Sequence, residues 1–455
     1  MRYVGIVLVL LSLPALWMWL RGNQKNLRYA YFGIGILPFV SGPLNLDAAL
    51  WHIGGLGYAK GLVLNLLDTL CLAILATSRT RILRLPFTGL FAGYIVASFL
   101  SVFQAPGFFA PFSYTFQLLR AFIVFAAVAT VVQRPGALTY IANGLAVGAI
   151  IQAVATIIQR LGGDLQAGGT IGHQNLTGMV LHFSTLPLLA MLLAGNTSKL
   201  YLAGLGGGFI ALGLGASRGS IAALTIGLIV LLLCSVIRKA TARKFGVIGV
   251  LVLMLVAASP LLYGGLAARF SDVSQITSSD GEREAFERAA SAMFADHPLG
   301  VGANRYTFVG ITEGYSERAG VTWAGASRTA VVHNLFYLTA AELGWFGLLT
   351  LIPLLAWVLL RGFHFAFSRR HDPSGDIVLG CTCAVLAVVA QSFYEWVFVM
   401  TTMNYMFAIA MGIIAGTIVQ RKAEARRMAR KPAVGQISEP SAAARPAHAS
   451  SSTAA

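Results

Sequence analysis

Residues 200–237 read LYLAGLGGGFIALGLGASRGSIAALTIGLIVLLLCSVI, and Arg218 is the only charged residue among them. A run of this length is enough for two helices to cross the roughly 30 Å hydrocarbon layer, joined by a short turn at Ser217-Arg218-Gly219. Similar apolar runs recur from Arg2 to Arg421. The chain is therefore predicted to be an all-α polytopic transmembrane bundle.

The composition excludes a soluble cytosolic enzyme. Of the 455 residues, 57% are hydrophobic, and only 11% are charged. The net charge of +16 does not indicate a nucleic-acid partner, because the basic residues sit in short loops between apolar runs rather than on one face. The four cysteines all fall inside apolar segments, so neither a disulfide framework nor a zinc site is expected.

We expect twelve or thirteen spans. The first, residues 3–20, is interpreted as a retained span because no convincing cleavage site follows it. The others are expected at 29–46, 61–77, 86–104, 115–133, 138–159, 176–195, 199–216, 220–237, 244–263, 333–360, 376–397 and 399–420. Lys and Arg gather in every second loop, which assigns those loops to the cytoplasm.

This assignment divides the chain into four parts. N-terminal transmembrane helices fill residues 1–263, an extracytoplasmic loop follows at 264–332, and C-terminal transmembrane helices fill 333–420. The loop is expected to be partly helical over residues 282–295, with Pro298 beyond the helix end. Residues 421–455 begin with a basic run and become Ala/Ser/Pro-rich, so a disordered cytoplasmic tail is predicted there.

The first candidate for chemistry is His333, which stands where the long loop enters a span. His333-Asn334 is followed by Glu342, Gly344 and Gly347, and the two glycines suit close packing. An imidazole at the membrane boundary can accept a proton from an attacking sugar hydroxyl. The alternative is an interfacial histidine that binds a backbone carbonyl.

Three arginines are candidates for binding an anion. A guanidinium at Arg218, beside Ser217, costs several kcal/mol within an apolar stretch unless it has a partner or ligand, although it could simply pair with a loop carboxylate. Arg283 stands among acidic residues of the loop, so local ion pairs are its simplest explanation. Arg120 lies slightly inside its span and could reach outward or join an anion site.

Other motifs are absent or ambiguous. Gly172-His173-Gln174-Asn175 could bind sugar hydroxyls or merely cap a helix. The sequence has no phosphate-binding loop ending in Lys-Ser/Thr, no HExxH and no acidic cluster for a divalent ion. We therefore expect no cofactor and no metal.

Together these features resemble the O-antigen ligase/O-antigen polymerase superfamily of membrane glycosyltransferases, which use glycans carried on undecaprenyl diphosphate. The resemblance rests on His-Asn-x9-Gly-x-x-Gly at 333–347, Ser217-Arg218-Gly219, and a loop pattern that includes Arg283 and Pro298-Leu299-Gly300-Val301-Gly302. It covers about residues 140–360 by motif. The loop has Phe286 where many relatives carry Trp.

The resemblance implies a GT-C-like fold and a metal-independent transfer on the periplasmic side of the bacterial inner membrane. His333 would be the catalytic base or orient the acceptor, Arg218 and Arg283 would bind the donor diphosphate, and the supporting residues would come from Asn334, Arg120, Glu342 and Ser217. The expected partners are an undecaprenyl-diphosphate-linked glycan, a lipid A-core or other glycan acceptor, and membrane lipids.

Ligation of O-antigen to lipid A-core is the first expectation. Polymerisation of the glycan on its carrier is second, and protein O-oligosaccharyl transfer is third. A transporter or flippase is the alternative from another class, but transporters place charges near the bilayer midplane, whereas here they cluster at one boundary and in one loop.

Overall fold

The computed structural model describes residues 2–254, 256, 273–322 and 327–430, apart from residues 45, 53, 79–81 and 105–106. Part of the predicted span 244–263, the start of the predicted loop and residues 431–455 of the predicted tail lie outside these residues. Residues 242–254 are helical. Residues 421–430 continue the last helix rather than starting a separate tail.

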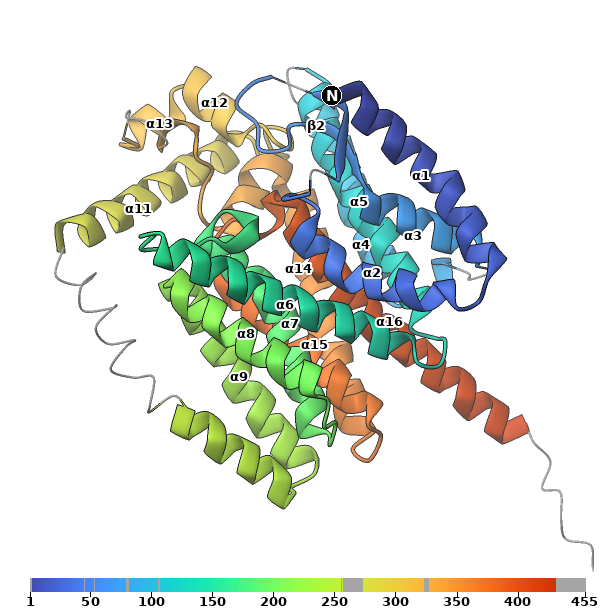
Figure 1. Ribbon diagram of the computed structural model, residues 1–455. Coiled ribbons are helices and arrows are strands. Elements are labelled where there is room, and N and C mark those ends of the chain that lie inside the picture. The colour runs from blue at the N-terminus through green and yellow to red at the C-terminus, as the bar shows by residue number, and fades with distance from the viewer. Residues whose placement is uncertain are drawn as a thin grey trace, which may run out of the picture.

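The described chain is a bundle of helices (Figure 1), as the sequence predicts. Eight helices of the described residues are long and apolar enough to cross a membrane. They are α1 (Arg2–Gly22), α5 (Phe109–Val131), α6 (Ala137–Leu161), α7 (Gln174–Leu193), α9 (Arg218–Arg238), α14 (Leu335–Ser368), α15 (Ser374–Gln391) and α16 (Thr401–Arg430).

Shorter helices occupy four more of the predicted spans. They are α2 (Asn26–Val40), α3 (Leu66–Ala76), α4 (Thr88–Leu100) and α8 (Lys199–Gly215). The predicted span 61–77 is helical only in its second part, because residues 61–65 form a strand. Asn65 then starts α3 with a capping box, in which its side chain accepts from Asp68 N and Asp68 accepts from Asn65 N.

The strand belongs to a small antiparallel hairpin that the all-α prediction did not include. β1 (Asp47–His52) pairs with β2 (Gly61–Asn65), with Asp47 opposite Asn65. Gly61 has φ +134°, and a Cβ there would lie 2.0 Å from the Trp51 carbonyl oxygen. The hairpin therefore needs glycine at this position.

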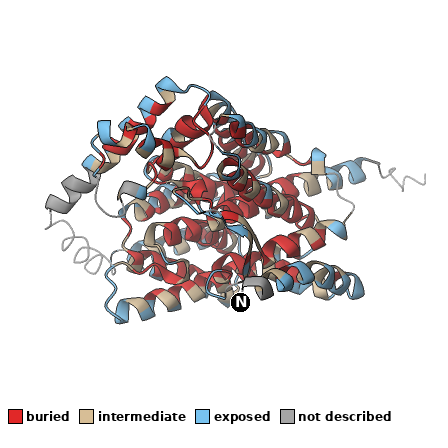
Figure 2. Ribbon diagram, turned by 90° about the horizontal axis from the view of Figure 1, so that it is seen from above, coloured by how far each residue is buried: buried red, intermediate tan, exposed pale blue. Residues whose placement is uncertain are grey.

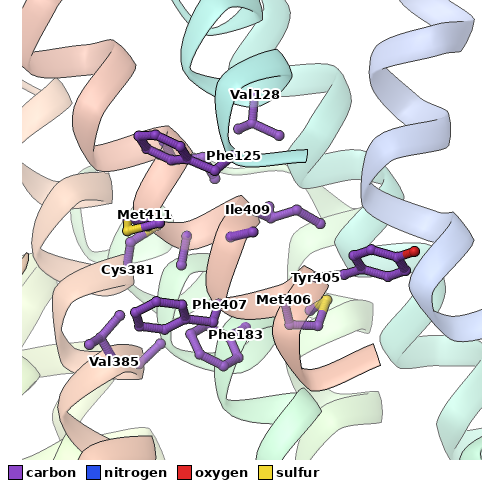
Figure 3. Close-up of a cluster of buried hydrophobic side chains, with 14 of the residues drawn as sticks. Phe125, Val128, Phe183, Cys381, Val385, Tyr405, Met406, Phe407, Ile409 and Met411 are labelled. Carbon is purple, nitrogen blue, oxygen red and sulfur yellow. The ribbon is translucent and has the colours of Figure 1, made fainter. Parts of the chain in front are cut away.

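The core of the bundle lies between α5, α7, α15 and α16 (Figure 3). These helices are mostly buried, whereas α1 is exposed along most of its length (Figure 2). Gly416 brings α16 against α5, because a Cβ there would lie 2.6 Å from the Ala129 carbonyl oxygen. Gly35 of α2 approaches α6 in the same way, near Ile141.

The long loop folds over one end of the bundle, at the top of Figure 1. It contains α11 (Val273–Asp296), α12 (Tyr306–Thr312), α13 (Tyr315–Arg318) and the 3₁₀ turn η4 (Ser327–Thr329). It contacts other segments that the sequence assigns to the same side. Asn304 exchanges hydrogen bonds with Ala59 N and O, each 2.9 Å long, and Ala303 N donates to Ser101 Oγ.

The basic loops meet at the other end. Arg238 pairs with Asp376, Lys244 lies 4.0 Å from the same carboxylate, and Arg421 pairs with Asp372 at 2.8 Å. The loops also contain short 3₁₀ turns, namely η1 (Ile82–Arg84), η2 (Ser101–Phe103), η3 (Gly169–Ile171) and η5 (Val397–Val399). Alternate loops thus gather at opposite ends of the helices, as the Lys/Arg pattern predicts.

Candidate functional site

His333 lies immediately before α14, and Asn334 fixes the backbone beside it. Asn334 is the N-cap residue of α14, and its Oδ1 accepts from the backbone N–H groups of Phe336 and Tyr337. Its Nδ2 donates to Glu287 of α11 and to the Phe393 carbonyl, each at 3.2 Å. Asn334 therefore joins three segments around His333 and is placed to position the imidazole.

The imidazole of His333 is surrounded by aromatic rings. Its centroid lies 6.0 Å from the ring of Phe286 and 6.0 Å from that of Trp396. His173 lies 6.0 Å from Trp396. Burial lowers the pKa of His333 to about 4, and the charges of Arg283 and His173 add to this effect. His333 is therefore neutral near pH 7, and its buried Nδ1 makes no hydrogen bond to the residues described.

Arg283 reaches a carboxylate that sequence reasoning did not single out. Its Nη2 lies 3.8 Å from Oε1 of Glu395, and the same oxygen accepts a 2.5 Å hydrogen bond from Asn175 Nδ2. The Arg283 side chain is 40% exposed, whereas that of Glu395 is 4% exposed. Arg283 thus has one side toward a buried counter-ion and the other toward the surface.

The Glu395 carboxyl group lies in an unusual electrostatic setting. Burial raises its pKa to about 7, although the Arg283 charge and the Asn175 hydrogen bond act in the opposite direction. Within the part of the chain that is described, Glu395 Oε2 is buried without a hydrogen-bond partner. A carboxyl group with a raised pKa beside a cation and a half-buried imidazole is typical of functional sites.

Arg218 opens α9, and its surroundings connect this helix to the same cluster. Ser217 caps α9 through a hydrogen bond from Ser220 N to Ser217 Oγ. Ser220 Oγ in turn donates to the Asn175 carbonyl at 3.3 Å and accepts from Gln391 Nε2 at 2.9 Å. Arg218 itself is exposed. Ser220, two residues further along, contacts the Asn175 segment that binds Glu395.

Glu342 anchors the loop. It is buried in α14, where its carboxylate accepts from Tyr58 Oη at 2.5 Å, Asn304 N at 2.8 Å and Tyr306 N at 2.9 Å. These contacts join the hairpin connection, the long loop and α14. The described geometry thus gives Glu342 a positioning role on the loop side of α14.

Gly344 breaks α14 where the loop inserts. It has φ +58° and ψ −151°, and a Cβ would lie 2.3 Å from the Pro298 carbonyl oxygen. The groups freed by the break bind the motif Pro298–Gly302 instead: Trp345 N donates to Pro298 O, and Gly302 N donates to Glu342 O. The close neighbour expected for this glycine is therefore a loop rather than a helix.

Arg120 lies in another cluster, inside the bundle. Its Nε is 2.7 Å from Asp68 Oδ2, and its Nη2 donates to the hydroxyl of Tyr405, which itself donates to Asp68 Oδ1. The side chains of Arg120 and Asp68 are 4% and 0% exposed. None of these contacts involves His333, Arg218 or Arg283.

The structure therefore brings His333, Asn334 and Arg283 together. It places Arg218 and Ser217 at the start of α9, which Ser220 connects to this cluster. Arg120 lies in a different cluster. The structure adds Glu395 and Trp396. The available signal for Glu395 was a carboxylate near the end of the predicted span 376–397, because a charged residue there needs a partner or a function. No group of three or more His, Cys, Asp or Glu in the described segments is placed to hold a metal ion.

Comparison with known proteins identifies the domain that contains most of this site. Residues 203–352 match the family model described as O-antigen ligase. No curated protein matches the chain. The matched range includes Arg218, Arg283, His333 and Glu342 but neither Arg120 nor Glu395. The domain gives the chain a glycosyltransferase-like role of the O-antigen ligase and polymerase type. The match spans about a third of the chain and supports an O-antigen ligase-type domain, in a chain whose described residues include eight helices long and apolar enough to cross a membrane.

Proposed function

We propose that the protein transfers a preassembled glycan from undecaprenyl diphosphate to a hydroxyl group of lipid A-core, at the periplasmic face of the bacterial inner membrane. The observation that supports this most is the neutral, half-buried imidazole of His333 beside the Arg283–Glu395 pair. An unprotonated base and a fixed cation are the two groups that a displacement on a glycosyl diphosphate requires.

In this mechanism, the acceptor hydroxyl oxygen attacks the anomeric carbon of the donor sugar. The bond between that carbon and the diphosphate oxygen breaks, the hydroxyl proton passes to the imidazole of His333, and undecaprenyl diphosphate leaves. A single displacement inverts the anomeric configuration. Arg283 and Arg218 stabilise the negative charge on the leaving diphosphate, so no metal is needed. Turnover by the purified enzyme should therefore be unchanged by EDTA.

Glu395 has a distinct role in this scheme. A free guanidinium at the membrane surface would sample many rotamers, and its entropy would be lost on binding. The carboxylate of Glu395, itself fixed by Asn175, holds Arg283 in place before the donor arrives. Because the other side of Arg283 is exposed, the donor diphosphate can bind without displacing Glu395.

Alanine variants test the assignment. His333→Ala, Arg218→Ala and Arg283→Ala should each reduce transfer by about a hundredfold or more, with unchanged membrane expression. Arg288→Ala is the matched control, because Arg288 lies on the same helix but contacts exposed Glu284 and the Ala319 carbonyl. Normal transfer by His333→Ala would disprove the catalytic assignment.

A deletion strain separates ligation from polymerisation. If the protein is the ligase, full-length glycan should accumulate on the lipid carrier and be missing from lipid A-core. Accumulation of single repeat units would instead identify a polymerase. The readout is the size distribution of glycan released from the carrier.

A further inference from the structure

A cavity of about 370 Å³ lies at the end of the bundle opposite the long loop. It is lined by the start of α6, the end of α7, the start of α15 and the last part of α16, and it opens to the surface. Its apolar lining includes Leu138, Met191 and Ile377. The proposed glycosyl transfer uses none of these residues.

Arg134 and Arg421 make the lining basic. The hydrogen bonds described for Arg134 go to two neutral hydroxyls, those of Tyr31 at 3.1 Å and Ser78 at 3.4 Å. Arg421, by contrast, binds the carboxylates of Asp372 and Glu424 at 2.8 and 2.7 Å. Arg134 is therefore the cation whose charge is less compensated by its described contacts.

The start of α6 adds to the positive potential. This helix is 25 residues long, and its N-cap residue, Gly136, provides no side-chain cap. Gly136 and Leu138 both line the cavity. In this first turn, Ala137 N and Thr139 N already donate to the carbonyls of Arg134 and Gly136, so the helix end favours an anion mainly through its partial positive charge. Neutral Asn196 and Ser374 supply further polar groups to the lining.

We infer that this cavity binds the phosphate of an anionic phospholipid from the leaflet at this end of the bundle. Arg134 binds the phosphate oxygens, the partial positive charge at the start of α6 favours them, and the glycerol and upper acyl chains lie against Leu138, Met191 and Ile377. A free phosphate would use the basic groups only. The apolar lining, together with the position of the cavity where four spans reach the membrane surface, favours a lipid.

Lipid retention by the purified full-length protein tests this inference independently of the proposed function. Native mass spectrometry should show phosphatidylglycerol bound to the wild type and not displaced by excess phosphatidylcholine. Arg134→Gln should weaken phosphatidylglycerol binding about tenfold, because one charge-assisted contact is lost. Ala194→Phe, which narrows the cavity but keeps both arginines, should weaken it as well. It also provides a second test if Arg134→Gln folds poorly.

Lys199→Gln is the matched control, because it removes an exposed charge from the first residue of α8, at the same end but outside the cavity lining. It should bind phosphatidylglycerol as the wild type does. Equal losses in Lys199→Gln and Arg134→Gln would overturn the site in favour of diffuse surface attraction. The lipid assignment would be overturned if inorganic phosphate stabilised the protein against heat as much as phosphatidylglycerol does. It would also be overturned if Arg134→Gln and Ala194→Phe both bound phosphatidylglycerol as tightly as the wild type.

Discussion

Glu395 and His333 together set the pH range of the proposed reaction. The pKa of Glu395 is raised to about 7, so the carboxylate that holds Arg283 is lost as the pH falls through that value. His333, with a pKa of about 4, stays neutral over the same interval. The kcat/KM of the wild type, measured from about pH 5 to pH 9, should therefore fall on the acid side with an apparent pKa near 7.

Glu395→Gln assigns this acid limb. The variant keeps a group that can accept from Asn175 but cannot ionise, so its rate should be lower and nearly independent of pH down to about pH 5. An acid limb that persists near pH 7 in Glu395→Gln belongs to another group, and the role of Glu395 would then be wrong.

Arg120 is expected to affect folding rather than donor binding. Removing it leaves the buried Asp68 carboxylate without its cation, which typically costs about 3–5 kcal/mol. Arg120→Ala should therefore reduce the yield of monodisperse protein, while the folded remainder keeps the wild-type KM for donor. Replacing both partners, as Arg120→Met with Asp68→Leu, should recover much of the yield. A well-folded Arg120→Ala protein with a raised donor KM would place Arg120 in the donor site.

The ion-pair partners of single residues could not be predicted from the sequence. Arg283 was expected to form local ion pairs, yet its described ion pair joins it to Glu395, 112 positions further along the chain by their residue numbers. Arg120 and Asp68 are 52 residues apart and belong to different helices. Composition and periodicity carry no information on such pairings, because they are set by which helices become neighbours.

At the scale of elements, the break in α14 controls the position of the long loop. Gly344→Ala would place a Cβ 2.3 Å from backbone atoms of Pro298 and Leu299, at a positive φ that alanine rarely adopts. We expect a loss of about 3 kcal/mol or more in stability and an almost complete loss of transfer. Thermal unfolding and transfer assays on the purified protein measure both effects.

Gly213→Ala is the matched control, because this helical glycine of α8 has open space where the Cβ would go. It should be neutral or stabilise by up to about 1 kcal/mol. If Gly344→Ala behaves like Gly213→Ala, the insertion of the loop into α14 does not determine the site.

The elements themselves were largely predictable. Long apolar runs identify the spans, and the loop helix was expected, although α11 begins nine residues before the predicted start at Glu282. The hairpin over residues 47–65 was not expected, since its second strand continues directly into an apolar helix without a change in composition. The helix break at Gly344 was hidden for the same reason: the sequence on both sides remains apolar.

At the scale of the described molecule, the candidate site lies at the end covered by the long loop, and the basic loops with Arg238, Lys244 and Arg421 meet at the other end. The site draws on α7, α9, α11, the start of α14 and the segment after α15, which are far apart in sequence. Several spans must therefore assemble before His333 and Arg283 can meet. The alternation of Lys and Arg predicts which end faces the cytoplasm, and labelling can test that orientation.

The native cysteines should give little background in this labelling experiment. Cys71, Cys381 and Cys383 are buried and Cys234 is partly buried, so the wild type should react little with a membrane-impermeant maleimide. Exposed Glu317 lies in the long loop, and exposed His371 lies between α14 and α15. In spheroplasts, Glu317→Cys should be labelled at once, whereas His371→Cys should be labelled only after the membrane is permeabilised. The reverse pattern would place His333 on the cytoplasmic side, where the proposed periplasmic transfer could not occur.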